Sequence, residues 1–349
     1  MVLVSLFILG AGFATMQEVM QYEASYGSRF WIVIAVAALI YVYTNISFVN
    51  NGNRLKLKNG GDIYEAYCGK WIGKFFNYFS ALFCYMSFVV MCGGANSTAV
   101  EQWGLPNGAG AVILAILVVI TAIAGLNGIV KTLGVLGPVI IMLIIGVSLY
   151  TAVKGWGNLN TGLEAVDTNK YAIAQVGNGN PFASGASYGG FVILWFAAFL
   201  GGIGARHDKK EVNTGMILST VAIFSVAAVC CIALIANIDI TWNAGVPALT
   251  LANTIHPWLA EAFAVIIFIG IYTSACPLLW TGIRKLSNEG TNKYKWLTVV
   301  GGALGCVIAC YVPYRPLLNV IYGLNGYLGF ILVAFMIVND VRVWKASKK

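Results

Sequence analysis

The sequence has few charged residues. Only 10% of its 349 residues are Asp, Glu, Lys or Arg, and 59% are hydrophobic, whereas a soluble domain has about 25% charged residues. The mean hydropathy is +0.80. This composition excludes an ordinary soluble domain and predicts an all-α polytopic membrane protein in a lipid bilayer. We expect the net charge of +8 in loops at the inner membrane face and not in a surface for nucleic acid.

The sequence also lacks the motifs of metal sites and of common enzymes. Its eight cysteines form no C-x-x-C pair, and seven lie in apolar segments, where free cysteine packs as a small hydrophobic residue. The two histidines, His207 and His256, have no partner at metal-ligand spacing. Phosphate-binding loops with lysine, G-x-S-x-G and H-E-x-x-H are absent as well. We therefore expect neither an enzyme nor an organic cofactor.

Long apolar segments are abundant. Each is close to the ~20 residues that cross a bilayer, and we count ten, at 2–22, 28–49, 72–94, 108–126, 131–153, 186–205, 212–237, 258–282, 296–312 and 317–340. If the N-terminus is inside and the spans alternate, 17 of the 21 Lys and Arg residues lie on the inner side. Positive residues favour the cytoplasmic side, so we expect both termini in the cytoplasm.

The spans divide into two groups of five. We expect a first repeat at 1–153, an outer loop at 154–185 and a second repeat at 186–349. Shifting the first half by about 185 residues brings its spans close to those of the second half. An odd number of spans in each half makes the two halves inverted relative to each other, as in many secondary transporters.

The first span has an unusual centre, Gly10-Ala11-Gly12. Each glycine costs a soluble helix about 1 kcal/mol relative to alanine. We therefore predict a helix broken at mid-membrane, with free N–H groups at Ala11, Gly12 and Phe13 that face an anion. The carbonyls of Leu6 and Leu9 are then free for a cation. The alternative is that both glycines only permit close helix packing.

Polar residues follow this glycine pair inside the same apolar span, among them Thr15 and Glu18. Glu18 lies six residues after Gly12, about 9 Å along a helix, and is therefore still within the membrane. Carboxylates at this depth are usually functional. Three roles stay open for Glu18: partner of a substrate amine, proton carrier, or structural hydrogen-bond acceptor.

Other spans provide candidates for the walls of a pocket. The shift between the halves places the first break on 195–200, so we expect a second broken helix there, with Trp195, Phe196 and Ala197 at the site. Glycines at 201, 202 and 204 favour the same break. Tyr85 and Asn325 are further pocket candidates from the third and tenth spans.

The eighth span contains Thr273 and Ser274, four and three residues before Pro277. Adjacent hydroxyls suit a hard cation, and a proline removes the hydrogen bond of the carbonyl four residues before it. The alternative is that these hydroxyls bond to their own helix backbone, as is common in membranes.

The segment from Gly10 to Glu18 resembles the amino acid–polyamine–organocation superfamily, whose members have the LeuT-type fold of five plus five inverted helices. It is most similar to the YkvI-type amino acid permeases of bacteria, which usually have glycine where this chain has Met16. The resemblance extends over all ten spans, but only this segment is sequence-specific. It implies a multi-pass protein of the bacterial inner membrane.

The resemblance also implies roles for single positions. In sodium-coupled members an amide pair, here Ala11 and Gly12, binds the substrate carboxylate. Their cation site uses two carbonyls of helix 1 and three residues of helix 8, which correspond to Leu6, Leu9, Gly270, Thr273 and Ser274. Sodium-independent members instead have a lysine deep in helix 5. Here the nearest one, Lys131, is expected at the cytoplasmic edge, which favours Na⁺ as the coupling ion.

We therefore expect a secondary active transporter of a small amino acid or related amine, with Na⁺ as coupling ion and alternating access around a midplane site. One alternative is proton coupling through Glu18. Another, from a different functional class, is a non-transporting membrane receptor or assembly protein on the same scaffold.

Overall fold

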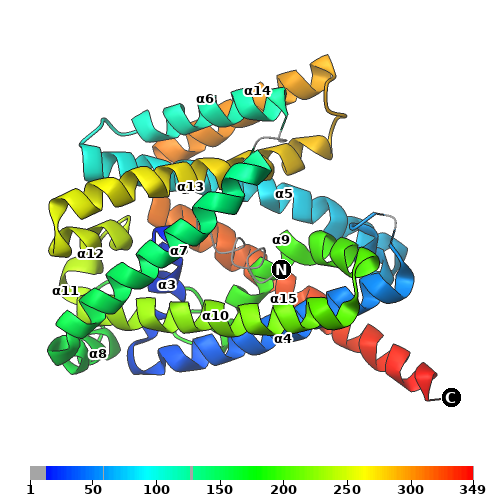
Figure 1. Ribbon diagram of the computed structural model, residues 1–349, viewed down its shortest axis with the longest axis horizontal. Coiled ribbons are helices and arrows are strands. Elements are labelled where there is room, and N and C mark those ends of the chain that lie inside the picture. The colour runs from blue at the N-terminus through cyan, green and yellow to red at the C-terminus, as the bar shows by residue number, and fades with distance from the viewer. Residues whose placement is uncertain (1–12, 58, 126–128, 349) are drawn as a thin grey trace.

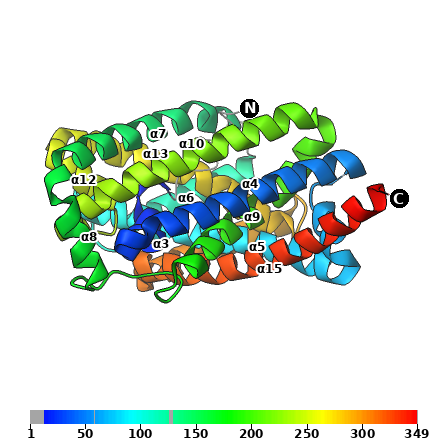
Figure 2. The ribbon, with the colours of Figure 1, turned by 90° about the horizontal axis from the view of Figure 1, so that it is seen from below.

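The computed structural model describes residues 13–57, 59–125 and 129–348, with the backbone alone for 129–138. Throughout these residues the chain forms helices and no strand, which confirms the all-α prediction. Most helices are long and lie beside one another in an elongated bundle (Figures 1 and 2). In chain order they are α3 (Gln17–Tyr22), η2 (Ala24–Arg29), α4 (Phe30–Leu55), α5 (Asp62–Trp103), α6 (Ala109–Ala124), α7 (Ile129–Lys154), η3 (Trp156–Asn158), α8 (Leu159–Asp167), α9 (Pro181–Arg206), α10 (Lys209–Ala236), α11 (Ile238–Thr241), α12 (Pro247–Ile255), α13 (Pro257–Arg284), α14 (Asn292–Tyr311) and α15 (Tyr314–Ser347).

The observed helices follow the predicted spans. Within the described residues, seven helices are long and apolar enough to cross a membrane. An eighth span results if the pair Val139–Lys154 and Trp156–Asp167, bent by 66°, counts as one, and α6 is a shorter apolar helix. Each predicted span from 28–49 onward overlaps one α-helix, and span 28–49 also includes the end of η2, whereas most of span 2–22 lies outside the described residues.

Several helices begin where the sequence supplies a capping side chain. The Asn180 amide oxygen accepts from the N–H of Phe182 at 2.9 Å, and Pro181 occupies the first turn of α9, where its missing N–H has no helical partner to lose. Asp208 caps α10 in the same way, accepting from the N–H of Lys210 at 2.8 Å. These local signals fix where α9 and α10 begin and so which of their residues reach the centre of the bundle.

The first helix is broken at Thr15 and Met16. Phe13 and Ala14 are helical, Met16 takes a left-handed conformation with φ 57°, and α3 begins at Gln17. The Thr15 carbonyl accepts from the N–H of Ala248 at 3.2 Å, in α12. This break follows the predicted one at 10–12, which lies outside the described residues and stays a prediction.

The predicted break in α9 is wrong. This helix runs without interruption from Pro181 to Arg206 and lies against α4 and α15. A Cβ atom at Gly190 would overlap the carbonyl oxygen of Gly326 in α15, and one at Gly204 would overlap that of Val49 in α4. Gly190 and Gly204 thus allow helices to approach at backbone distance, as small residues do in membranes, and no loosening of the helix results.

Candidate substrate-binding site

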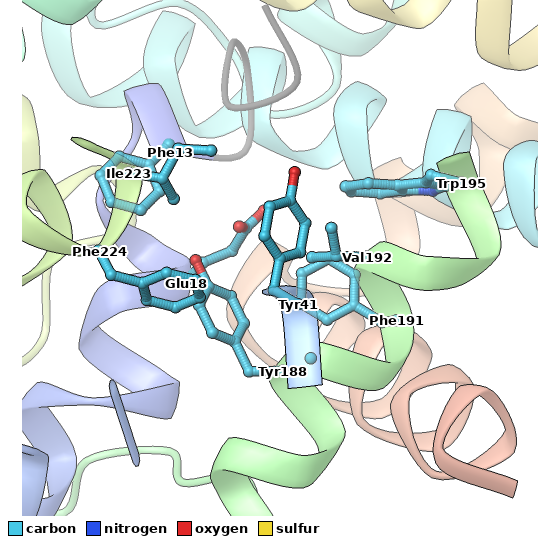
Figure 3. A pocket seen from close by; sticks show the side chains of 10 residues that line it. Phe13, Glu18, Tyr41, Tyr188, Phe191, Val192, Trp195, Ile223 and Phe224 are labelled. Carbon is cyan, nitrogen blue, oxygen red and sulfur yellow. The ribbon is translucent and has the colours of Figure 1, made fainter. Parts of the chain in front are cut away.

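A small cavity of about 40 Å³ lies where the broken first helix meets α4, α9 and α10. Its walls are mostly aromatic, and its single acidic lining residue is Glu18. The lining residues are Phe13, Glu18, Tyr41, Tyr188, Gly189, Phe191, Val192, Trp195, Ile223 and Phe224. Figure 3 shows the Glu18 carboxylate near the centre, with the rings of other lining residues around it.

Glu18 reaches the cavity because the chain breaks just before it. With Met16 in the left-handed region, α3 starts at Gln17 and places Glu18 in its first turn. The side chain is only 4% exposed, and its Oε1 atom has no hydrogen-bond partner among the described residues. A buried carboxylate oxygen without a partner is costly, so a ligand that donates a hydrogen bond to this atom would remove that cost.

The α9 wall of the cavity is rigid. Tyr188, Phe191 and Trp195 recur at the three- and four-residue spacing that places them on one helix face. The Trp195 indole N–H donates to the Ser87 hydroxyl at 2.9 Å, and its ring stacks on Phe83 with centroids 5.5 Å apart and planes at 9°. An indole held by both contacts has little freedom to change rotamer, so it presents a fixed edge of the cavity.

The opposite wall comes from α4 and α10. The rings of Tyr41 and Phe224 meet edge to face at 6.1 Å, and Tyr188 meets Phe224 edge to face at 6.3 Å, so the two walls are in contact. Aromatic faces attract organic cations, by about 2 kcal/mol or more where water is excluded. Aromatic rings around one carboxylate therefore form an environment suited to an ammonium group.

The structure brings three predicted site residues together in this cavity, Phe13, Glu18 and Trp195. Phe196 and Ala197 are not among the lining residues, because α9 stays helical and faces the cavity with its earlier turns. Thr15 lies at the break, where its hydroxyl is hydrogen-bonded to that of Tyr314 at 3.0 Å. It holds the break and does not line the cavity.

Two further predicted residues lie away from the cavity. The Tyr85 hydroxyl donates to the carbonyl of Gly301 in α14 at 3.0 Å. The Asn325 amide is buried in α15 and donates to the carbonyl of Ile321 in its own helix. Both side chains act in helix packing here, although the Oδ1 atom of Asn325 has no partner within the described residues.

The predicted cation site is described only on its α13 side. The Thr273 hydroxyl is buried and donates to the carbonyl of Gly270 at 3.0 Å, as the backbone-bonding alternative expects, but its oxygen keeps lone pairs for a cation. Ser274 is half-buried. The remaining predicted ligands, Leu6 and Leu9, lie outside the described residues, as do Gly10, Ala11 and Gly12 of the predicted substrate site.

Most of the aromatic residues that line the cavity were not predicted from the sequence. Tyr188 and Phe191 precede the predicted second break and were overlooked because the site was sought at 195–200. Their spacing of three and four residues up to Trp195 is the sequence signal that identifies them, because this spacing places all three rings on one helix face. Tyr41 and Phe224 carry no comparable signal, because a single aromatic residue in an apolar span is usually packing.

The chain matches no protein-family model, and no curated protein matches its sequence. Solved structures resemble it in fold. MhsT in complex with L-phenylalanine has 14% identity and a TM-score of 0.64, over 95% of this chain and 88% of that one. An inward-facing conformation of Mhp1 has 15% identity and a TM-score of 0.60, over 96% and 73%. A variant of the Eremococcus coleocola manganese transporter has 15% identity and a TM-score of 0.57, over 97% and 76%.

These neighbours differ in what they bind. MhsT holds L-phenylalanine, and Mhp1, a nucleobase-cation-symport-1 family transporter, also occurs with bromovinylhydantoin bound. Such low identity establishes the fold and leaves the substrate open. The neighbours described by function are transporters, in agreement with the prediction of a non-enzyme. The chain is therefore a multi-pass membrane protein with the LeuT-type transporter fold.

Proposed function

We propose that the protein is a secondary active transporter of a small amino acid or related amine. The observation that carries this proposal is the Glu18 carboxylate, buried among aromatic rings, with an oxygen that has no hydrogen-bond partner in the described part of the chain. In the same part of the chain the only ion pair joins Arg284 to Glu289, so no described basic side chain is paired with Glu18. A substrate ammonium would supply the missing charge.

The ammonium would bind between Glu18 and the rings of Tyr41 and Tyr188. Charge-assisted hydrogen bonding to the carboxylate and attraction to the ring faces act on the same group. In an amino acid substrate, the carboxylate would face the predicted N–H groups of Ala11 and Gly12. The apolar side chain would then lie along Phe191 and Trp195, in a cavity whose volume favours small substrates.

Na⁺ is the coupling ion that we propose. Gly270, Thr273 and Ser274 would bind it together with the carbonyls of Leu6 and Leu9, so that the ion links the broken helix to α13. We further propose that the protein belongs to the YkvI-type permeases, lies in a bacterial inner membrane with both termini in the cytoplasm, and alternates access by moving its two inverted halves, 1–153 and 186–349.

A thermal-shift screen tests substrate binding. The purified protein is heated with glycine, L-alanine, L-phenylalanine, ethylamine or phenethylamine, and with propionate as the matched acid that lacks an amine, each in sodium and in choline chloride. We expect stabilisation by one or more of the amines and none by propionate. Stabilisation by propionate alone, or by none of the compounds, would refute an amine site at Glu18.

Transport in proteoliposomes tests the coupling ion. We expect a Thr273→Ala, Ser274→Ala double variant to lose the sodium dependence of uptake, because both proposed side-chain ligands are removed. A Thr214→Ala variant, whose hydroxyl is exposed in α10 and donates to its own helix, is the matched control. Sodium dependence that survives the double substitution would exclude this site.

Proton coupling through Glu18 is the second candidate. It is favoured by the same unpartnered Oε1 atom, since a carboxylate in this position can bind a proton as well as an ammonium. A Glu18→Gln variant separates the two roles. If Glu18 binds the amine, the variant loses substrate binding, and if it carries the proton, the variant keeps binding and substrate exchange but loses uptake driven by a pH gradient.

A further inference from the structure

A second carboxylate lies close to the candidate site without belonging to it. Glu23 ends α3, five residues after Glu18, and its side chain is completely buried, with 0% exposure. Neither Oε1 nor Oε2 has a hydrogen-bond partner among the described residues. Its backbone is engaged: the N–H donates to the carbonyl of Val19 at 3.0 Å, and the carbonyl accepts from the N–H of Tyr26 at 2.9 Å.

The groups that face Glu23 are acidic or neutral. Those that interact with it electrostatically are Glu18 on its own helix, Tyr188 on α9, and Cys230 and Cys231 on α10. From α15, Tyr314 and Tyr322 face Glu18. η2 contributes Tyr26 and Arg29, but the Arg29 guanidinium is exposed and lies 6.0 Å from the centre of the Tyr26 ring.

A permanent positive partner for Glu23 is therefore missing from the described part of the chain. The residues that precede it cannot provide a basic side chain either, because residues 1–12 contain no Lys, Arg or His. An ionised carboxylate at this depth costs several kcal/mol unless it is compensated. With no such partner in the described residues, Glu23 is open to neutralisation by a group that reaches it from solution.

The surroundings of Glu23 select a proton over a metal ion. Hard cations require several oxygen ligands, whereas Glu23 is faced by the thiols of Cys230 and Cys231, which are poor ligands for them. The Ser148 hydroxyl, which lies beside Cys230, is already hydrogen-bonded to its sulfur at 3.3 Å. A proton needs no additional ligand, because it is bound covalently to one carboxylate oxygen.

We propose that Glu23 is a proton-binding site that takes up one proton from the outer solution and releases it to the inner solution in each transport cycle. The inference rests on the proposed function in that Glu18 takes the ammonium of the substrate. An uncompensated carboxylate is costly where water is excluded, so the outward-open site closes with the ammonium on Glu18 and a proton on Glu23. When the inner side opens, water reaches Glu23 and the proton leaves with the substrate.

Transport in proteoliposomes provides the first test. The probes are radiolabelled L-alanine and methylammonium, with and without an inside-alkaline pH gradient, at equal sodium on both sides. We expect the gradient to raise accumulation in the unmodified protein. Glu23→Gln, which mimics the protonated acid in shape and charge, should keep substrate exchange but lose the stimulation. Glu164→Gln, at an exposed position in α8, should behave like the unmodified protein. Equal stimulation of the Glu23→Gln variant would overturn the proposal.

A second measurement needs no substrate. Infrared difference spectra of the purified protein, recorded while the pH is changed, report the C=O stretch of protonated carboxylic acids. We expect a titrating band that is absent in Glu23→Gln and present in Glu18→Gln. The same band in all three proteins would overturn the proposal even if neither probe is transported. Loss of transport in every protein together with the expected band would instead contradict the proposed substrate class.

The Glu23→Asp variant tests whether misfolding explains the loss of gradient stimulation in Glu23→Gln. It keeps the titratable group but shortens the side chain, so we expect it to regain part of the gradient stimulation that Glu23→Gln lacks. If Glu23→Asp and Glu23→Gln both unfold at the temperature of the unmodified protein and both lack gradient stimulation, the carboxylate is not the proton carrier.

Discussion

The first helix and α9 were predicted to be a matched pair of broken helices, yet only the first is broken. The break at Thr15 and Met16 contains no glycine, whereas α9 contains six glycines and stays helical from Pro181 to Arg206. What differs is the surroundings. α9 meets the backbones of α4 and α15 through glycine, and the first helix meets polar partners at Tyr314 and Ala248.

This difference shows that glycine by itself does not break a membrane helix. A broken helix leaves N–H and C=O groups without helical partners, and lipid cannot satisfy them. At Thr15 the N–H of Ala248 satisfies the carbonyl. Where α9 crosses α15, the nearest atoms belong to the backbone of another intact helix, and a break there would expose groups without partners.

The largest expected effect comes from filling the contact between α9 and α15. Gly190→Val introduces a Cβ that overlaps the carbonyl oxygen of Gly326, and overpacking of this kind costs about 3 kcal/mol. We expect a clear drop in unfolding temperature, measured by thermal denaturation in detergent. Gly202→Val is the control, since a Cβ at Gly202 would meet nothing within 4 Å. Equal stability of both variants would mean that the glycine contact is unimportant.

The next largest effect is expected on the first-helix side, at Glu18. Removal of its charge in Glu18→Gln deletes a charge-assisted hydrogen bond worth about 2 kcal/mol, which corresponds to a roughly 30-fold loss of affinity. The dissociation constant for the amine found in the screen measures this loss, and Glu164→Gln serves as the control. Unchanged affinity would show that Glu18 does not bind the amine.

Met16→Gly tests why the broken segment has no glycine at its left-handed residue. Glycine relieves a cost of about 1 kcal/mol for a left-handed backbone, but loss of a buried methionine side chain costs about 2–5 kcal/mol in soluble proteins. Met16 is 0% exposed, so packing should outweigh strain. We expect a net destabilisation of at least about 1 kcal/mol in thermal unfolding. A more stable Met16→Gly variant would show that strain dominates.

The sequence predicted the fold well because spans and charges are local or additive signals. Nine predicted spans each overlap one α-helix, since a run of about 20 apolar residues is decided by composition alone. The helix caps Asn180 and Asp208 are local signals as well, because each directly precedes its helix in the sequence. The unbroken α9 could not be predicted, because two of its glycines pack against Gly326 and Val49, which are distant in the sequence.

The candidate site was predictable only in part, for the same reason. Glu18 was found because a charge in an apolar span is conspicuous wherever it packs. Tyr41 and Phe224 are ordinary residues of apolar spans, and only the packing of α4 on α10 places them at the cavity. Glu23 was missed because it comes at the end of the first span, where an acidic residue is expected to reach water.

The smallest expected effect concerns the hydrogen bond between the Thr15 and Tyr314 hydroxyls, 3.0 Å apart, which ties the break to α15. A double-mutant cycle with Thr15→Val and Tyr314→Phe isolates it, because each substitution removes one hydroxyl and keeps the shape of the side chain. Hydrogen bonds between membrane helices contribute about 0.6 kcal/mol on average. The double variant should therefore lose less stability than the two single variants together, by about that amount. Strictly additive losses in thermal unfolding would show that α15 does not hold the break through this bond.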